Sequence, residues 1–271
     1  MKISVVGIGK AGTLIAKFFH SRGYTVSHLI NRTPERAFKL AREIPGCKAG
    51  DFSLFSELEG VVFIATIDSV IREVFQKLWK VNKKVEYFIH LSGSVSSDVF
   101  KEAAEAGKGV ASFHPNLSIS SFSLSPNVLN KVIFGIEGNQ KGISFLTSLT
   151  EKEGLRYVNI ATEGKLIYHA AAVFASNFSQ FIIKVASDLY VEKLRFDETV
   201  VRELLKMYLN GLLVKLNAGT LNEFSGPAAR NDTETIEREK KALVEISPHL
   251  SRLYEELTEM IWCLRGDEFE H

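Results

Sequence analysis

The chain has 271 residues, of which 45% are hydrophobic and 24% are charged. These fractions are those of folded globular proteins, so disordered, fibrous and coiled-coil classes are excluded, and the length allows one large domain or two small ones. The 33 Lys and Arg residues nearly balance the 32 Asp and Glu residues, for a formal net charge of +1, so we expect no nucleic-acid binding through bulk positive charge.

The first half of the chain alternates short apolar runs with amphipathic segments, the pattern of strand–helix–strand units. The predicted strands are residues 2–6, 25–30, 61–65, 85–91, 110–113, 131–136 and 156–160. The predicted helices between them are residues 11–21, 34–43, 69–79, 96–106 and 140–153. Because strands that are apolar throughout are typical of parallel sheets covered on both faces, we expect a doubly wound, mostly parallel α/β domain.

The strand pattern stops near residue 160, and the second half reads as helical throughout. The predicted helices are residues 163–192, 197–217, 232–245 and 248–264. We therefore expect an α/β domain over residues 1–160 and an all-α domain over residues 161–271. The most apolar stretch, residues 166–186, includes His169, Asn177 and Lys184, which would be costly in a bilayer, so a buried protein helix is expected there.

The cysteines and the first residues bear on the compartment. Cys47 and Cys263 are too few for a disulfide framework and lack zinc-site spacing, so no metal is expected. Met1 and Lys2 lead directly into a strand pattern without the features of a signal peptide. We expect a cytoplasmic protein that is not attached to a membrane.

A glycine-rich loop follows the first predicted strand and opens the first predicted helix. It matches the G-x-G-x-x-G pattern, with Gly7, Ile8, Gly9, Lys10, Ala11 and Gly12 in turn. In a dinucleotide site Gly7 permits the tight turn, Gly9 lets the backbone approach a pyrophosphate, and Gly12 lets helix and strand pack closely. The alternative is an ordinary glycine-rich turn, but the strand before it and the helix after it favour dinucleotide binding.

The end of the second predicted strand indicates which dinucleotide binds. NAD sites place Asp or Glu there, whereas this chain has Asn31, Arg32 and Thr33. A guanidinium can bind a 2′-phosphate with two hydrogen bonds, and Asn31 and Thr33 can add others. We therefore expect NADP(H) rather than NAD, although Arg32 could also be a solvated loop residue.

Other strand ends are expected at the same edge, because ligands of open α/β sheets bind at the carboxyl ends of the strands. We expect the cofactor to be bordered there by Ala65, Thr66, Asp68, Ser92, Gly93 and His114. His114 is the imidazole of this set, and Pro115 restricts its backbone. It is a candidate catalytic or substrate-contacting residue, and a structural histidine is the alternative.

Polar side chains recur at four-residue spacing on the first helix of the second half. Lys165, His169 and Asn177 lie on one slowly drifting stripe, and Tyr168 flanks it. Buried polar groups need partners, which can be a ligand or a neighbouring helix. We take His169, Asn177 and Lys165 as candidate catalytic residues and Tyr168 as a candidate substrate contact.

A loop between two later helices carries Arg230 before Asn231 and Asp232. Capping of the next helix explains Asn231 or Asp232 but not Arg230. The Arg230 guanidinium could hold a substrate carboxylate or tie the loop to the first domain.

These residues together carry a resemblance to a known group. The motifs are the loop at residues 7–12, Asn31-Arg32-Thr33, Ser92-Gly93-Ser94, Phe113-His114-Pro115, Tyr168-His169-Ala170-Ala171-Ala172, Ser176-Asn177, Gly226-Pro227 and Arg230-Asn231-Asp232. They resemble the Rossmann-like NADP-binding proteins whose C-terminal helical half is a domain of unknown function, which are often described as NADP- or deazaflavin-dependent oxidoreductases. The resemblance implies an NADP-binding first domain and a second domain that mediates dimerisation.

A more distant similarity is to pyrroline-5-carboxylate reductases, ketopantoate reductases and β-hydroxyacid dehydrogenases. The last group places a catalytic Lys and an Asn four residues apart on the long helix. In this chain Lys165 has His169 at that spacing, and Asn177 lies two turns further along. Their proton-donor assignment therefore does not transfer directly.

Two functions follow from these observations. The first is an NADP(H)-dependent oxidoreductase acting on a small carbonyl, imine or alcohol, with His169 or Lys165 as proton donor, Asn177 holding the reacting atom and His114 beside the nicotinamide. The second is a non-catalytic NADP-binding sensor or scaffold, because fold and cofactor do not establish chemistry. In either case we expect a homodimer formed through the C-terminal helices.

Overall fold

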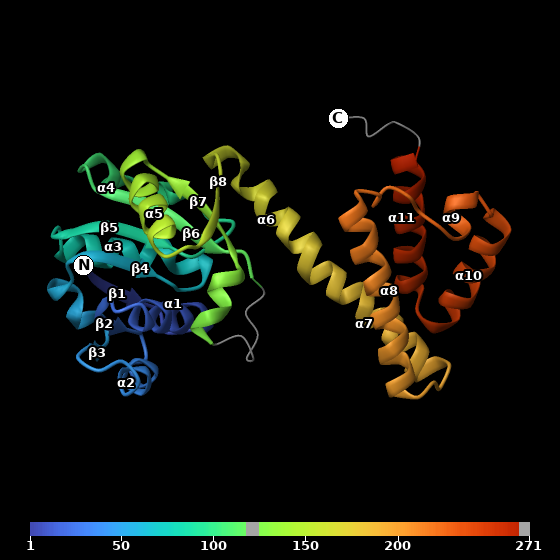
Figure 1. Cartoon of the computed structure of the whole chain (residues 1–271), viewed down its shortest axis with the longest axis horizontal. Coiled ribbons are helices and arrows are strands. Elements are labelled where there is room, and N and C mark those ends of the chain that lie inside the picture. Colours follow the sequence, from blue (N-terminus) through green and yellow to red (C-terminus); the bar gives the residue numbers. More distant parts are fainter. Residues whose placement is uncertain (118–124, 266–271) are drawn as a thin grey trace. The chain divides into compact units, whose positions relative to one another are not determined.

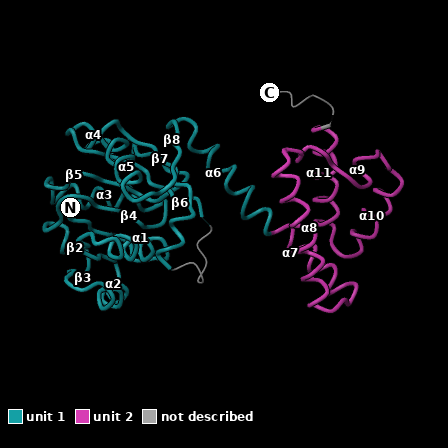
Figure 2. The backbone as a smooth tube through the Cα atoms, viewed as in Figure 1, with its two compact units in different colours: residues 1–180 teal, residues 181–271 magenta. Residues whose placement is uncertain are grey.

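The computed structural model describes residues 1–117 and 125–265. The chain divides into two compact units, Met1–Gln180 and Phe181–His271 (Figure 2). The sequence placed a domain border near residue 160, where the last strand ends at Asn159. The helix that follows this strand also belongs to the first unit, which ends at Gln180.

The first unit is built on one eight-stranded sheet, with strand order β3-β2-β1-β4-β5-β6-β7-β8. The strands are β1 (Lys2–Val6), β2 (Thr25–Ile30), β3 (Lys48–Gly50), β4 (Gly60–Ile64), β5 (Val85–His90), β6 (Gly109–Pro115), β7 (Ile133–Gly138) and β8 (Arg156–Asn159) (Figure 1). All neighbouring pairs are parallel except β6 and β7. The order of the first six strands is that of a doubly wound dinucleotide-binding fold, which confirms the predicted fold class.

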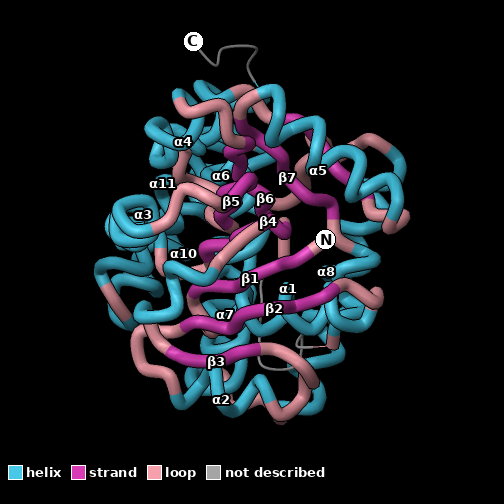
Figure 3. The backbone as a smooth tube through the Cα atoms, turned by 90° about the vertical axis from the view of Figure 1, so that its left-hand side faces the viewer, coloured by secondary structure: helices cyan, strands magenta, loops and turns pink. Residues whose placement is uncertain are grey.

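Helices cover both faces of this sheet (Figure 3). They are α1 (Lys10–Ser21), α2 (Glu35–Ala41), α3 (Ile71–Val81), α4 (Lys101–Glu105) and α5 (Gln140–Lys152). Successive side chains of a strand enter different buried clusters: Val5 packs with residues of α1, whereas Val6 packs with residues of α3. Alternation of this kind means that both sheet faces are buried, which explains why the strands are apolar throughout.

The second unit is helical in all of its described secondary structure. Its helices are the end of α7 (Ser179–Asp188), then α8 (Glu198–Ala218), α9 (Pro227–Arg230), α10 (Thr233–Ile246) and α11 (Pro248–Arg265). The Asp197 carboxylate accepts from the Thr199 amide at 2.8 Å and so caps the start of α8. Gly219 ends α8 in the left-handed conformation, with φ of 72°, a backbone geometry that favours glycine.

Before α8, helix α6 (Lys165–Val173) continues through a π-helical turn (Phe174–Phe178) into α7 and a second π turn (Leu189–Lys193). By length and composition, the stretch Thr162–Lys193 could cross a membrane, and none of its most apolar 18-residue window is buried. The expectation of a buried helix over residues 166–186 is therefore wrong for the single chain. Leu166 and Ile167 are 68% and 75% exposed, because hydropathy does not say whether an apolar face is covered by its own chain.

Candidate functional site

The glycine loop joins β1 to α1 at the carboxyl edge of the sheet. The structure explains why glycine occupies each of its three glycine positions. Gly7 has φ of 101°, and a Cβ there would lie 2.7 Å from the Ala65 backbone. A Cβ at Gly12 would lie 1.9 Å from the Gly7 carbonyl oxygen. Around Gly9, in contrast, no atom lies within 4 Å of the place a Cβ would take. The loop is therefore tight at its ends and open at the glycine that a pyrophosphate would approach.

Asn31 supports this loop from the end of β2. Its side-chain oxygen accepts from the Ile8 amide at 3.0 Å, and its amide nitrogen donates to the Thr33 carbonyl at 2.8 Å. The sequence assigned Asn31 to phosphate binding. In the structure its side chain holds the glycine loop in shape, which is a positioning role.

A cavity of about 500 Å³ opens beside the loop at the ends of β1, β2 and β4. It is lined by Gly7, Gly9, Asn31, Arg32, Thr33, Arg36, Phe52, Ala65, Thr66, Ile67, Val70, Glu73, Val74 and Lys77. Thr66 brings a hydroxyl that is buried and has no hydrogen-bond partner among the described residues. A cavity of this size with an unpaired polar atom has room and chemistry for a ligand.

Three cations line this cavity: Arg32, Arg36 and Lys77. Sequence reasoning found Arg32 and missed the other two; Arg36 lies four residues after Arg32, but Lys77 is distant in sequence and is brought close by α3. Lys77 pairs with Glu73 at 2.6 Å. That hydrogen bond lowers the pKa of Glu73, as do the charges of Lys77 and Arg32. With one carboxylate against three cations, the cavity is suited to an anion.

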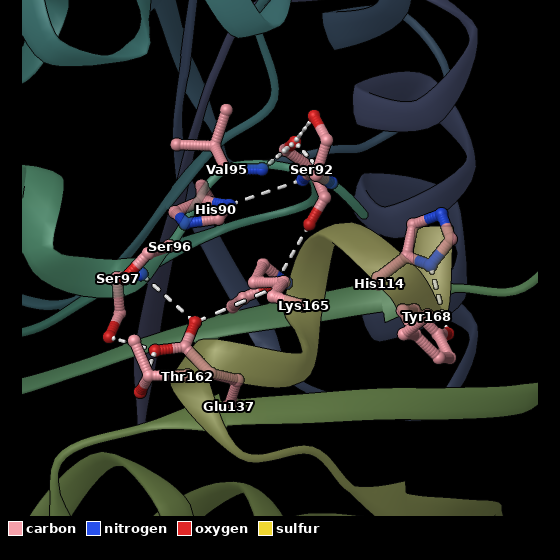
Figure 4. Close-up of polar contacts among 12 residues, drawn as sticks. His90, Ser92, Val95, Ser96, Ser97, His114, Glu137, Thr162, Lys165 and Tyr168 are labelled. Carbon is pink, nitrogen blue, oxygen red and sulfur yellow. Dashed lines mark hydrogen bonds and ion pairs between the residues drawn. The ribbon is translucent and has the colours of Figure 1, made fainter. Parts of the chain in front are cut away.

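The ends of β4 and β5 are joined through a carboxylate. Asp68 accepts from the hydroxyls of Ser92 at 2.8 Å and Ser94 at 2.7 Å. The Ser92 hydroxyl also accepts from the Val95 amide at 3.0 Å (Figure 4). Asp68 and Ser92 were both predicted to border the cofactor. The structure shows that they fix the Ser92–Gly93–Ser94 turn against the neighbouring strand end.

Lys165 is linked to that turn through Ser112 and is not among the residues that line the two cavities described in this section. Its side chain is 1% exposed, and Nζ donates to Ser112 Oγ at 2.7 Å. Ser112 Oγ in turn donates to the Ser92 carbonyl at 2.8 Å. Burial lowers the pKa of Lys165 to about 8, although the carboxylates of Glu137 and Asp68 oppose this shift. The sequence proposed Lys165 as a proton donor, whereas the structure places its ammonium in a buried network behind the site.

Glu137, at the end of β7, is the acidic member of this network, and the sequence analysis missed it. Its carboxylate accepts from the Ser97 amide at 2.9 Å, the Ser97 hydroxyl at 2.7 Å and the Thr162 hydroxyl at 3.2 Å (Figure 4). Lys165 Nζ lies 4.0 Å from it. A charged residue that ends an otherwise apolar run, as in Ile133-Phe134-Gly135-Ile136-Glu137, was the available signal.

A second cavity, of about 370 Å³, brings three predicted catalytic residues together. It is lined by His114, Asn116, Leu117, His169, Ala172, Val173, Ala175, Ser176 and Asn177. Four residues make slightly more than one turn of an α-helix but less than one turn of a π-helix. In a regular α-helix, the Asn177 side chain would therefore be rotated around the helix axis away from that of His169. The π turn that contains Asn177 reduces this rotation, so that both side chains line the same cavity.

The two imidazoles of this cavity both lie close to Gly93, with ring centroids 6.1 Å apart. A Cβ at Gly93 would be 2.6 Å from His169 Cδ2 and 2.8 Å from His114 Cε1. His114 Nδ1 lies 3.0 Å from the hydroxyl oxygen of Tyr168. Burial, followed by the charges of Lys165 and His169, lowers the pKa of His114 to about 4. His114 is therefore uncharged at neutral pH.

Arg230 ends the short helix α9 in the second unit and is exposed. Asp232 beside it caps α10 by accepting from the Thr235 amide at 3.1 Å. The cap explains Asp232, as the sequence suggested. The contact of Arg230 with a substrate stays a prediction.

Two family models match parts of the chain. Residues 1–84 match the shikimate/quinate 5-dehydrogenase family, and residues 132–261 match a domain of unknown function, DUF2520. The second match begins at β7, so it takes in the last two strands as well as the helical half. These matches confirm the predicted combination of a Rossmann-like first domain with a C-terminal domain of unknown function. Among curated proteins, none matches this chain.

Solved structures share the fold along nearly the whole chain. Protein TM1727 from Thermotoga maritima is 26% identical, with a TM-score of 0.72 over 97% of each chain. BF3122 from Bacteroides fragilis, provisionally named an NADP oxidoreductase, is 22% identical, with a TM-score of 0.75 over 96% of this chain and 97% of that one. An imine reductase from Pseudomonas sp. is 17% identical, with a TM-score of 0.65 over 97% of this chain and 92% of that one. The chain thus shares its fold with an imine reductase and with a protein provisionally named an NADP oxidoreductase.

Proposed function

We propose that this protein is an NADP(H)-dependent oxidoreductase that acts on a small carbonyl, imine or alcohol. The observation that carries the proposal is the cavity beside the glycine loop, where Arg32, Arg36 and Lys77 surround a space open to Gly9. The similarity to BF3122, which is provisionally named an NADP oxidoreductase, and to an imine reductase supports the same reaction class.

The residues fit a dinucleotide phosphate. The open space at Gly9 admits a pyrophosphate at the start of α1, where free amide groups and the helix dipole favour an anion. The guanidinium groups of Arg32 and Arg36 suit the 2′-phosphate of the adenosine half, because planar guanidinium groups bind phosphate with paired hydrogen bonds. The unpaired hydroxyl of Thr66 is a further hydrogen-bonding group for the ligand.

The second cavity is the proposed substrate site. When bound, NADP(H) supplies or accepts the hydride. His114, His169 and Asn177 surround the space in which the reacting carbon would lie. His169 exchanges the proton that accompanies hydride transfer, and Asn177 holds the reacting oxygen or nitrogen.

Coenzyme titration of the protein and of Arg32→Ala tests the coenzyme assignment. We expect NADPH to bind more tightly than NADH, and the preference to fall about 10- to 100-fold in the variant, the range for one charge-assisted hydrogen bond. Arg42→Ala is the matched control, because Arg42 follows α2 and does not line the cavity. Equal binding of both nucleotides by the parent protein would overturn the assignment.

Turnover distinguishes the enzyme from a sensor or scaffold. NADPH consumption is followed with a panel of keto acids, aldehydes and cyclic imines, for the parent protein and for His169→Ala and Asn177→Ala. We expect activity with at least one class and a loss of 100-fold or more in His169→Ala, the usual contribution of general acid catalysis. NADPH binding without turnover across the panel would favour the non-catalytic alternative.

We also propose that the protein is a homodimer formed through its C-terminal helices. In α8, the side chains of Leu212, Leu213, Val214 and Leu216 are each at least half exposed. Clusters of exposed apolar side chains on a protein surface often mark an interface with another chain, and a second copy would cover these. Sedimentation equilibrium is expected to give twice the chain mass. A monomer would contradict the proposal.

A further inference from the structure

The contact between Tyr168 and His114 bears on how the substrate is activated, and this step rests on the proposed function. Their atoms Oη and Nδ1 lie 3.0 Å apart, and the rings meet edge to face with centroids 5.7 Å apart. Tyr168 projects from α6, and His114 lies in β6, so the contact joins two elements that line the substrate cavity.

One hydrogen lies between these two atoms, and the atom to which it is covalently bonded can be inferred. Among the described residues, His114 is the one hydrogen-bond partner of the Tyr168 hydroxyl. The hydroxyl also lies beside Gly135, since a Cβ at Gly135 would be 2.6 Å from Tyr168 Oη. If Nδ1 held the proton, the tyrosine hydrogen would have no acceptor among the described residues, which is unfavourable for this half-buried hydroxyl. Tyr168 is therefore the donor and Nδ1 the acceptor.

An uncharged imidazole carries one N–H, so a proton-free Nδ1 leaves the hydrogen on Nε2. Nε2 lies on the Gly93 side of the ring, 2.9 Å from where a Cβ of Gly93 would be. We propose that Tyr168 fixes His114 as a neutral, Nε2-protonated imidazole, which polarises the acceptor atom of the substrate or nicotinamide as a hydrogen-bond donor and does not transfer its proton. Tyr168 is then a positioning residue.

The charges around His114 agree with this assignment. Lys165 and His169, from α6, disfavour a second proton on the ring, and Asp68, near the end of β4, is the opposing charge. Burial raises the pKa of Tyr168 above its usual value, so the phenol does not give up its proton to refill Nδ1. Transfer from Nε2 would leave a histidine anion or a buried tyrosinate, and both are unfavourable. In this proposal His169, and not His114, exchanges the proton that accompanies hydride transfer.

The test is a long-range ¹H–¹⁵N correlation spectrum of the full chain labelled with ¹⁵N-histidine, which distinguishes the two neutral tautomers and the charged form. The chain has seven histidines, and loss of one set of signals in His114→Gln identifies His114. We expect the Nε2-protonated pattern, unchanged between pH 5.5 and pH 8. A charged ring, or an Nδ1-protonated ring, at pH 7 would overturn the proposal.

Tyr168→Phe removes the donor, and Tyr157→Phe is the matched control because its hydroxyl contacts Glu151 at 3.3 Å on the surface. We expect mixed tautomers in Tyr168→Phe, the parent pattern in Tyr157→Phe, and a kcat reduced about tenfold in Tyr168→Phe with unchanged KM for NADPH. An unaltered His114 spectrum in Tyr168→Phe would contradict the proposal. The parent spectrum is decisive even if Tyr168→Phe fails to fold, and because it needs no coenzyme, its outcome is separate from that of the proposed activity.

Discussion

Lys165 Nζ lies 4.0 Å from the Glu137 carboxylate, and each side chain is 1% exposed. Glu137 also contacts Ser97 and Thr162, so the pair connects the end of β7 with the segment after the Ser92–Gly93–Ser94 turn and with the start of α6. Of these segments, α6 lines the proposed substrate cavity through His169, Ala172 and Val173. A buried ion pair is a weak source of net stability, but loss of one partner leaves an uncompensated charge.

Glu137→Leu should therefore destabilise the protein by about 3–5 kcal/mol, measured as the free energy of unfolding in urea. The buried ammonium of Lys165 would lose its counter-ion, and Ser97 would lose its acceptor. Glu163→Leu is the control, because Glu163 is an exposed carboxylate in the same region. A loss no larger in Glu137→Leu than in Glu163→Leu would show that the pair does not hold this part of the fold together.

The lowered pKa of Lys165 predicts an alkaline effect on stability. In the folded protein Lys165 releases its proton near pH 8, whereas in the unfolded chain it does so near 10.5. The cost of burying the charge is fully present below pH 8, and between pH 8 and 10.5 the unfolded state binds more protons, so stability rises with pH. The gain from this group is about 3 kcal/mol at most. The stability difference between the parent and Lys165→Met should shift by about 2 kcal/mol from pH 7.5 to pH 10, since this interval covers most of the titration but not all of it; a constant difference would refute it.

The burial of His90 predicts a loss of folding stability at acidic pH. Burial and the nearby Lys165 charge lower the pKa of His90 to about 3, against 6.5 in the unfolded chain. Above pH 6.5, His90 is neutral in both the folded and the unfolded state and does not affect stability. As the pH falls from 6.5 towards 3, His90 is protonated in the unfolded chain but stays neutral in the folded protein, so the free energy of unfolding decreases. Unfolding between pH 7 and pH 4 should become easier, and His90→Gln should remove about 3 kcal/mol of that loss. Equal acid sensitivity in the two proteins would exclude His90 as its source.

The fold could be predicted closely from the sequence, because buried parallel strands and amphipathic helices have distinct periodicities. The strand β3 was missed, since Lys48-Ala49-Gly50 is too short and too little apolar to be recognised. The burial of the helix over residues 166–186 was predicted wrongly for a related reason. Periodicity shows that a face is apolar, but not which surface it meets.

The site was predictable where its residues follow a strand end or a helical stripe, as with Gly7, Arg32, His114 and His169. Residues brought in by tertiary packing were not: Lys77 reaches the coenzyme cavity from α3, and Glu137 reaches Lys165 from β7. Such pairs have no fixed sequence spacing. Only a folded chain places them together.

The coenzyme cavity predicts opposite effects for two neighbours on α3. Lys77→Ala should weaken NADPH binding about tenfold and leave NADH binding unchanged, because it removes one cation from the proposed phosphate site. Glu73→Gln should strengthen NADPH binding, since it frees Lys77 and removes the one carboxylate of the lining. Lys80→Ala, on the same helix but outside the cavity, is the control. Isothermal titration with both nucleotides checks all three, and parallel changes for NADPH and NADH would place the 2′-phosphate elsewhere.

Gly93 lies close to both imidazoles of the substrate cavity, so its replacement tests their placement directly. In Gly93→Ala the new methyl group would overlap His169 Cδ2 and His114 Cε1, at 2.6 Å and 2.8 Å, and both rings must move. Side chains at a cavity can rotate, so we expect a loss of about 1 kcal/mol in stability. The chemistry is more sensitive, because a displacement of 1 Å can lower kcat about 100-fold. Gly164→Ala is the control, since no atom lies within 4 Å of its Cβ position. Full activity in Gly93→Ala would mean that the two histidines do not act together at this place.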